Sequence, residues 1–350
     1  MMPGYDSKTP KNLRESESMI RLPLRLVGVS LLCSFTILSG CKSGEKKSES
    51  NTEAPKKLLI VCTTTMIADQ AREVAGDHAK VASIMRPGIN PHTYEPRPDD
   101  SILFRKADLI LANGLHLEGR MLDMIEAAGN KAHKLGEHPD IKTRTSVGGA
   151  LPDPHVWWNI RYFVHFVEQT ADALAKLDPA NAKEYRENAK RYISQLEETD
   201  KKILDAIKLI PEKQRLMITS HDAFYYYGRR YGLKVDAVLG ISTDAEANAG
   251  EPLRLAKLAT ENNIGAVFHE TSVSQAQNDL VDSITRLSKS KFDHELKVAG
   301  PLYSDSLDEP GAPAGTYSGA IWKNTSVIVE ALTGKKLEEL KPDLPASPTQ

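Results

Sequence analysis

The sequence predicts an α/β fold of two parallel-sheet lobes bridged by a single long α-helix. Three observations favour it. Short apolar strand patterns alternate with helical patterns both before residue 159 and after residue 211. A highly charged helical pattern of unusual length separates these two regions. The chain has 350 residues, 40% hydrophobic and 26% charged, which is enough material for two ordinary domain cores.

Residues 1–41 are predicted to be an export signal. Arg21 and Arg25 precede an apolar run over residues 26–38, which is too short to cross a bilayer as a stable helix. We expect translation to start at Met19, because residues 1–18 are polar and acidic enough to weaken the basic start of the signal.

The apolar run ends in Leu38-Ser39-Gly40-Cys41, which resembles the bacterial lipobox. We therefore expect Cys41 to be lipidated and to become the first residue of the mature protein. Residues 42–56 are polar, with no aliphatic side chain larger than alanine, and are predicted to form a disordered tether. Only Cys62 would then remain as a free cysteine, so we expect no disulfide within the chain.

The first lobe is predicted over residues 57–177. A continuous apolar run at Leu58–Cys62 is typical of a strand buried on both faces of a parallel sheet. A helix is expected at 66–75, and further strands at 81–85 and 109–112.

The linking helix is predicted over residues 178–210, after the break at Asp178-Pro179. Its helical pattern runs from about 181 to 209, which would make it about 43 Å long, more than one compact domain needs. One apolar stripe is expected along it: Tyr185, Ala189, Tyr192, Ile193, Leu196, Leu204 and Ile207. We interpret this helix as the spine that joins the lobes.

The second lobe is predicted over residues 211–340, where the alternation resumes. The expected strands lie at 216–219, 235–238, 266–269 and 298–302. The tail 341–350 contains three prolines and is expected to be frayed.

Four possible metal ligands follow predicted strands or precede a helix: His92, His155, His221 and Asp305. In open parallel sheets, ligands bind beyond the carboxyl ends of the strands. His92 lies in a proline-stiffened loop, His155 in Asp153-Pro-His155, and the other two directly after strands. Two come from each lobe, so the metal site is expected in the interlobe cleft.

These segments, in this order and with these separations, resemble the metal-binding receptors of the TroA-like family (cluster A-I), which serve zinc and manganese ABC importers. The resemblance extends from about residue 58 to 337 and includes Asn113-Gly-Leu-His-Leu-Glu118 and Glu251-Pro252. It implies that His92, His155, His221 and Asp305 bind the metal. It also implies two α/β lobes bridged by one long helix.

The resemblance further implies the partners and the location. The expected partners are an ABC permease with its ATPase, and the membrane through the lipid anchor. The protein is expected to be a monomer at the periplasmic or other extracytoplasmic face. Lys and Arg total 45 against 47 Asp and Glu, so no excess of basic charge favours nucleic acid as a partner.

The donor set itself suits a transition metal. Three imidazoles and one carboxylate form a borderline site that favours Zn²⁺ and tolerates Mn²⁺ or Fe²⁺, whereas Mg²⁺ and Ca²⁺ prefer oxygen ligands. Three further residues are candidates for supporting the ligands: His116 and Glu270, which follow or end strands, and Asn159, which could also cap a helix.

The choice between zinc and manganese stays open at this point. Many zinc-binding members of the family carry a long His-rich loop between the first two ligand segments, and residues 99–154 contain only three histidines. Manganese-binding members often have glutamate as the third ligand, whereas this chain has His221. The two indications oppose each other.

Two other functions remain as alternatives, a siderophore or metal-chelate receptor and an exported zinc hydrolase. A hydrolase needs an open coordination position and a nearby base, and the chain has no His-Glu-x-x-His motif, so we expect no enzymatic activity. A chelate receptor needs a wide basic or aromatic cleft instead of four metal ligands. Adhesion has been attributed to some relatives, and no residue here argues for it.

We predict that Cys41→Ser yields soluble or uncleaved protein that still folds. Each acyl chain contributes about 0.8 kcal/mol per buried methylene, and nothing else in the sequence would hold a membrane. Fractionation of cells that express the variant measures this. Correct cleavage together with continued membrane association would show that the lipobox interpretation is wrong.

Overall fold

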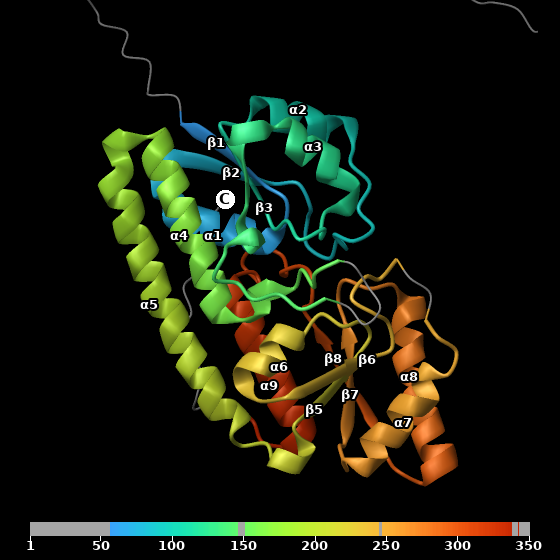
Figure 1. Cartoon of the computed structure of the whole chain (residues 1–350). Helices are drawn as coiled ribbons and strands as arrows, with labels where there is room; N and C mark the ends of the chain where they lie inside the picture. The colour runs from blue at the N-terminus through green and yellow to red at the C-terminus, as the bar shows by residue number, and fades with distance from the viewer. Residues whose placement is uncertain (1–56, 146–150, 245–246, 338–341, 343–350) are drawn as a thin grey trace, which may run out of the picture. The chain divides into compact units, whose positions relative to one another are not determined.

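The structure, a computed structural model, describes residues 57–145, 151–244, 247–337 and 342. The predicted signal 1–41 with Cys41, the tether 42–56 and all of the tail 341–350 except residue 342 lie outside these described residues. Within them, helices and strands alternate in two α/β lobes (Figure 1). None of the helices in the described ranges is both long enough and apolar enough to span a membrane.

A four-stranded parallel sheet forms the centre of the first lobe. Its strands, in the spatial order β2-β1-β3-β4, are β1 (Leu58–Cys62), β2 (Ala79–Ser83), β3 (Leu109–Ala112) and β4 (Ala132–Lys134). β1 lies between β2 and β3, and its Ile60 aligns with both Val81 and Leu109. The second strand was predicted two residues too late, and β4 was not predicted.

Helices cover both faces of this sheet, which explains why its inner strands are apolar without alternation. The helices of this lobe are α1 (Thr65–Ala75), α2 (Pro98–Lys106), α3 (Leu122–Ala127) and α4 (Ile160–Leu177). Ile60 and Leu111 share a core cluster with α1 and α4. Val61 and Ile110 face the other way, into a second cluster with residues of α2 and α3.

The second lobe contains two parallel strand pairs, β5 with β6 and β7 with β8, and β5 also contacts β7. The strands are β5 (Leu216–Thr219), β6 (Lys234–Ala237), β7 (Ala266–Glu270) and β8 (Lys297–Leu302). The helices are α6 (Tyr225–Tyr231), α7 (Glu251–Glu261), α8 (Gln275–Phe292) and α9 (Tyr317–Thr333). α7 packs against α8, and α9 packs against β8.

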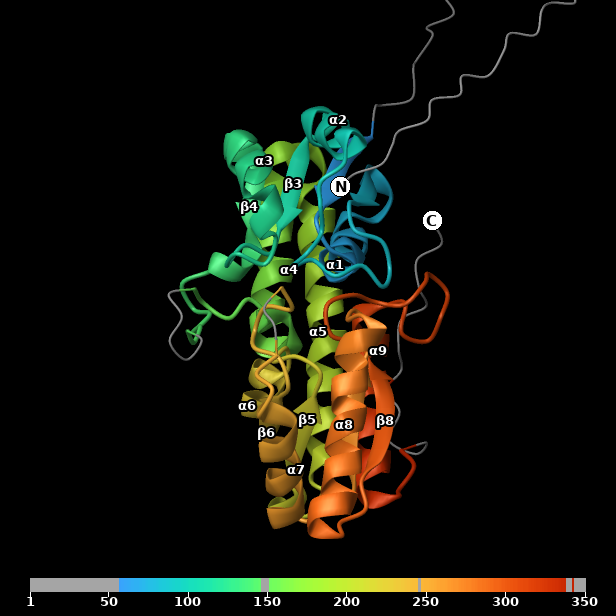
Figure 2. The ribbon, with the colours of Figure 1, turned by 90° about the vertical axis from the view of Figure 1, so that its right-hand side faces the viewer.

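The longest of the described helices is α5 (Ala182–Ile207), which contacts α1 and α4 of the first lobe and α6 and α9 of the second. Figure 2 shows it running beside elements of both lobes. The predicted apolar stripe is buried at Tyr185 and Leu196, but Ile203 occupies the buried position expected for Leu204, and Ile193 is half-buried. The division of the chain into domains at residues 178 and 211 stays a prediction.

One buried carboxylate joins three of these helices. Asp69 of α1, 2% exposed, accepts hydrogen bonds from the backbone N–H of Tyr317 in α9 at 2.9 Å and from the hydroxyl of Tyr192 in α5 at 3.2 Å. Burial raises the pKa of Asp69 to about 7, against the lowering effect of these donors. Asp69 thereby ties the start of α9 to the first lobe.

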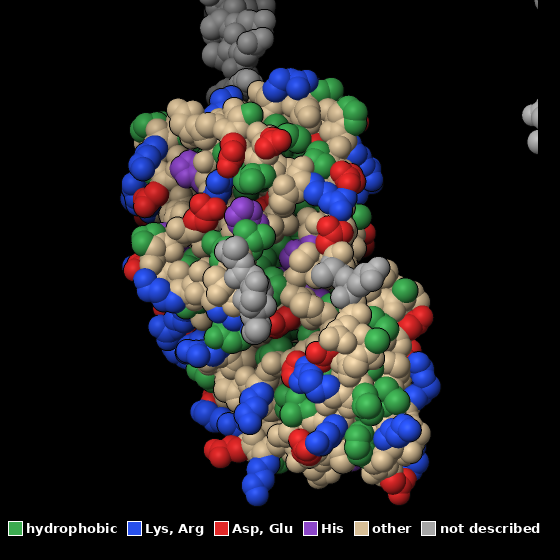
Figure 3. All heavy atoms as spheres, turned by 45° about the vertical axis from the view of Figure 1, so that its right-hand side comes forward, with side chains coloured by type: hydrophobic (Ala, Val, Ile, Leu, Met, Phe, Trp, Pro, Cys, Tyr) green, Lys and Arg blue, Asp and Glu red, His purple; other side chains and the backbone are tan. Residues whose placement is uncertain are grey.

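The face drawn in Figure 3 carries acidic and basic side chains mixed together. This distribution agrees with the nearly balanced charge of the whole chain.

We predict that Asp69→Ala lowers the free energy of unfolding by about 2 kcal/mol or more, because two buried donors lose their acceptor. Asp69→Asn should cost less, since its side-chain oxygen can still accept while the buried charge is removed. Urea unfolding of each variant measures this. The matched control is the exposed Asp77→Ala, and an equal loss in Asp77→Ala and Asp69→Ala would contradict the assigned role.

Candidate metal centre

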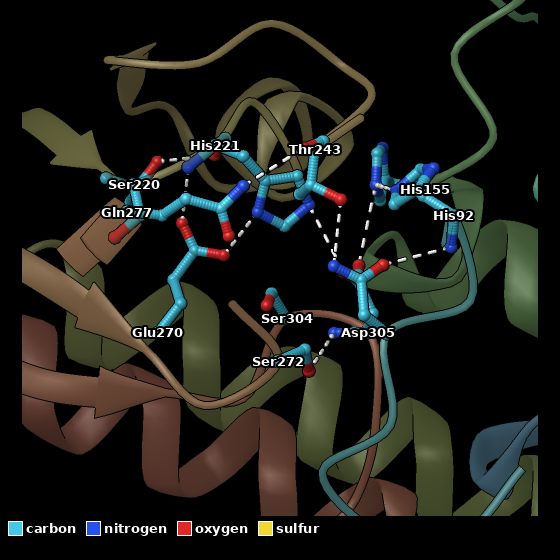
Figure 4. Close-up of polar contacts among 12 residues, drawn as sticks. His92, His155, Ser220, His221, Thr243, Glu270, Ser272, Gln277, Ser304 and Asp305 are labelled. Atoms are coloured by element: carbon cyan, nitrogen blue, oxygen red, sulfur yellow. Dashed lines mark hydrogen bonds and ion pairs between the residues drawn. The ribbon is translucent and has the colours of Figure 1, made fainter. Parts of the chain in front are cut away.

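Four side chains from the two lobes converge on one buried point (Figure 4): His92, His155, His221 and Asp305. One ligating atom of each lies within 4.8 Å of the others. The exposed fraction is 9% for His92, 0% for the other two histidines and 1% for Asp305. The structure thus brings together all four ligand candidates of the sequence, shielded from water.

The loop that carries His92 follows β2 and is held against the second lobe. The side-chain oxygen of Asn90 accepts the backbone N–H of His92 at 3.0 Å, while its amide nitrogen donates to Thr243 Oγ1 at 2.8 Å. The backbone N–H of Gly88 donates to Ser306 Oγ at 2.7 Å. The position of His92 therefore depends on contacts between the lobes.

His155 precedes α4 and is oriented by a carboxylate. Asp153 Oδ1 accepts the backbone N–H of His155 at 3.0 Å and lies 2.8 Å from its Nδ1. Arg144 Nε donates to the other oxygen of Asp153 at 2.9 Å. A carboxylate at Nδ1 favours the tautomer with the proton there, which leaves the lone pair of Nε2 available to a metal.

His221 follows β5 and is oriented in the same way by Glu270 at the end of β7. One oxygen of Glu270 accepts the backbone N–H of His221 at 2.7 Å, and the other lies 2.5 Å from Nδ1. Nε2 of His221 therefore also offers its lone pair to the centre.

The ligating atoms of the four side chains, three imidazole nitrogens and the oxygens of a carboxylate, therefore lie close to one another. Nε2 of His155 lies 3.5 Å from one oxygen of Asp305, and Nε2 of His221 lies 3.3 Å from the other. Nε2 of His92 lies 3.1 Å from Nε2 of His155. Neither oxygen of Asp305, nor Nε2 of His221, has a hydrogen-bond partner among the described residues. Buried polar atoms without partners are costly, so the arrangement favours a cation between them.

The charges of the centre shift the pKa values of its members. Burial lowers the pKa of His92 to about 3. Burial also lowers the pKa of His221, but the charges of Glu270 and Asp305 outweigh this effect and hold it well above its ordinary value. Burial acts to raise the pKa of Asp305, yet the imidazoles, His221 foremost, hold it below its ordinary value. In the absence of metal, a proton on His221 thus supplies the positive charge.

The supporting residues proposed from the sequence lie in different places. Glu270 contacts His221 directly. Asn159 accepts the backbone N–H of Arg161 at 3.0 Å and caps α4, as its position before a helix suggested. His116 is exposed and lines a separate hollow, and no hydrogen bond or ion pair between described residues joins it or Asn159 to the four candidates. We leave both outside the proposed site.

Sequence reasoning missed the roles of Asp153 and Arg144. The Asp-Pro-His sequence carried a signal for the first, because a carboxylate two residues before a histidine can reach its ring. Arg144 was not foreseeable, because it lies outside the motif. It donates from Nε to Asp153 and from Nη2 to Asp222.

Three imidazole nitrogens and one carboxylate match the ligands of Zn²⁺ and of other borderline divalent ions. The two histidines held by carboxylates have their donor atoms fixed in advance. Since two ligands come from each lobe, a bound ion would hold the lobes together.

Comparison with known proteins gives a consistent result. Residues 60–331 match the family described as "Zinc-uptake complex component A periplasmic". The chain is 36% identical over 310 residues to the manganese-binding lipoprotein MntA of Bacillus subtilis, covering 88% of this chain and 98% of that protein. It is 28% identical over 313 residues to the manganese ABC transporter substrate-binding lipoprotein PsaA of Streptococcus mitis, with 86% and 96% covered.

Among solved structures, the fold resembles the periplasmic zinc-binding protein TroA from Treponema pallidum. The TM-score is 0.75 at 31% sequence identity, and the match covers 79% of this chain and 99% of that one. The lobes and their parallel strands therefore follow a known arrangement.

We predict that zinc binding at pH 7 releases about one proton from His221, because its raised pKa keeps it protonated until the metal displaces the proton. The apparent affinity should therefore fall as the pH is lowered. Calorimetric titration in two buffers of different ionisation enthalpy measures the release.

Glu270→Gln is the matched comparison for this experiment. It keeps an acceptor beside His221 but removes the charge that raises the pKa, so fewer protons should be released. Equal proton release by both proteins, or none by the unsubstituted protein, would contradict the electrostatic account of the centre.

Proposed function

The chain belongs to the zinc-uptake complex component A family, and on that premise we propose that His92, His155, His221 and Asp305 bind the metal that it carries. The protein binds a divalent transition metal, Zn²⁺ or Mn²⁺, outside the cytoplasm and delivers it to an ABC importer. The observation that carries the ligand assignment is the convergence of electron-pair donors around Asp305, whose buried oxygens lack hydrogen-bond donors among the described residues.

Delivery would depend on the two-lobe arrangement, which we propose divides at the predicted boundaries 57–177, 178–210 and 211–340. A metal that takes ligands from both lobes stabilises the closed form by its differential affinity for that form. α5 contacts helices of both lobes, which favours a small tilt over a wide hinge motion. The permease and its ATPase would then recognise the closed surface.

We further propose that the protein acts as a monomer anchored through lipidated Cys41. The names of the relatives MntA and PsaA include the word lipoprotein, in agreement with the lipobox in this sequence. The membrane would then be contacted through the acyl chains, with the folded lobes on the extracytoplasmic side.

A binding role also accounts for the chemistry of the centre better than catalysis does. Four protein ligands fill the coordination of a tetrahedral ion and leave no open position for a water nucleophile. The ligands are at most 9% exposed, which leaves little access for a substrate or for a bulky metal chelate. Neither the hydrolase nor the chelate receptor is favoured by these observations.

We predict that Asp305→Asn weakens zinc binding by more than about 100-fold, because a supporting residue alone costs ten- to a hundredfold and a direct ligand should cost more. Asparagine preserves the volume of the side chain and removes only its charge. Competition titration with a chelator of known affinity measures the loss.

The matched control is Asp99→Asn, since Asp99 is an exposed aspartate in the first turn of α2. It should bind zinc as tightly as the unsubstituted protein. Unchanged affinity in Asp305→Asn, or an equal loss in both variants, would mean that the ligand set is wrongly assigned. Repeating the titration with Mn²⁺ compares the two candidate metals directly.

A further inference from the structure

A second group of metal-binding side chains lies at the surface of the first lobe: His138, Asp140 and His165. His138 and Asp140 follow the short helical turn Leu135–Glu137, and His165 lies on α4. One ligating atom of each lies within 4.8 Å of the others. None of the three belongs to the centre formed around Asp305.

The two imidazoles are close and nearly parallel. The ring centroids of His138 and His165 lie 4.4 Å apart, with an angle of 11° between the ring planes. Nδ1 of His138 lies 3.8 Å from an oxygen of Asp140. Ligands of a tetrahedral zinc ion lie about 3.3 Å from one another, given metal–ligand bonds of about 2.0–2.1 Å. The donor atoms therefore lie near one another, but the lone pairs of two parallel rings lie in parallel planes, so at least one imidazole must rotate before both can bind the same ion.

The chain segment that carries His138 and Asp140 is a tight turn. The backbone N–H of Ile141 donates to the carbonyl of His138 at 3.0 Å, and Pro139 occupies the second position of the turn, where it is favoured. The backbone N–H of Asp140 also reaches Nδ1 of His138, at 3.3 Å, a long hydrogen bond that a metal could replace at low cost.

The turn is held next to α4. The side-chain amide of Gln169 donates to the carbonyl of Leu135 at 2.9 Å and to that of His165, one helical turn earlier, at 3.1 Å. This contact fixes the distance between the loop and the helix. The donor atoms from the two segments are thus brought together by the fold and not by chance rotation of long side chains.

His165 is also oriented for metal binding. Its Nδ1 lies 3.1 Å from a carboxylate oxygen of Glu168, which favours the tautomer with the proton on Nδ1 and a free lone pair on Nε2. The same type of pairing orients His155 and His221 in the buried centre.

We propose that His138, Asp140 and His165 form an accessory site for a divalent transition ion of the zinc class. Two nitrogens and one oxygen are borderline donors, and three protein ligands leave one position to water. The side chains of both histidines are about one-quarter exposed and that of Asp140 is 71% exposed, so the site is open to solvent. It binds more weakly than the buried four-ligand centre and exchanges its ion freely.

Zinc titration of the full-length protein tests this site. Two binding events are expected, a tight one and a weaker one, each of one ion. His138→Ala and His165→Ala should each abolish the weaker event and leave the tight one unchanged. Asp140→Asn should weaken it by about tenfold or more. Retention of the tight event and of the melting temperature confirms that the variants are folded.

The matched control is His78→Ala. His78 is a surface histidine paired with Glu184 at 2.8 Å, with a side chain 28% exposed, and it belongs to neither of the two groups of metal-binding side chains found among the described residues. Its removal should leave both events intact. In Asp305→Asn protein the weaker event should persist, which separates this proposal from the assignment of the buried centre. A single event in the unsubstituted protein, or a weaker event that survives both histidine substitutions, would overturn the proposal.

Discussion

The centre of this protein is organised by a buried carboxylate whose oxygens find no hydrogen-bond donor among the described residues. Asp305 is 1% exposed, and its two oxygens lie 3.5 Å from Nε2 of His155 and 3.3 Å from Nε2 of His221. An ionised carboxylate in such surroundings is unfavourable unless a positive charge accompanies it. The surrounding residues strengthen this requirement, because Asp153 and Glu270 favour a proton on Nδ1 of two histidines, so that the charge facing Asp305 comes from a metal or, in its absence, from a second proton on His221.

Contacts beside the ligands also connect metal binding to the position of one lobe against the other. Trp157 and Trp158, which follow His155 by two and three positions, donate through their indole nitrogens to the carbonyl of Ser304, at 3.2 and 2.7 Å. Ser304 precedes Asp305, so a segment of the first lobe fixes the backbone beside a ligand of the second. A shift of one lobe therefore changes the distance between His155 and Asp305. Since coordination tolerates only small changes in distance, the ion and the closed arrangement stabilise each other.

Much of the fold was predictable because its strands are short, apolar and bounded by turns. Leu58–Cys62, Leu109–Ala112 and Leu216–Thr219 have the predicted bounds. β4 was missed because Ala132–Lys134 has one small apolar residue between loops and owes its pairing to β3. The long helix was predicted from the helical repeat of its apolar residues. Which residue is buried near its end, Ile203 instead of Leu204, depends on tertiary packing.

The four ligand candidates of the centre were also predictable, because local sequence signals mark them. Each of the four ligand candidates has a local signal: a stiff loop, an Asp-Pro-His sequence, or the end of a strand. The residues that orient them have weaker signals, because Glu270 reaches His221 across 49 positions of the chain.

Contacts between distant segments also explain why the accessory group was invisible in the sequence. His138 follows the helical turn Leu135–Glu137 and His165 lies on α4, so only the packing of that turn on α4 brings their rings together. The local sequence shows which metal-binding side chains a segment carries. Which other segment lies beside it depends on the packing of the whole lobe. The two metal-binding groups differ in this respect: the buried one is marked at four separate places in the chain, and the exposed one exists only in the folded protein.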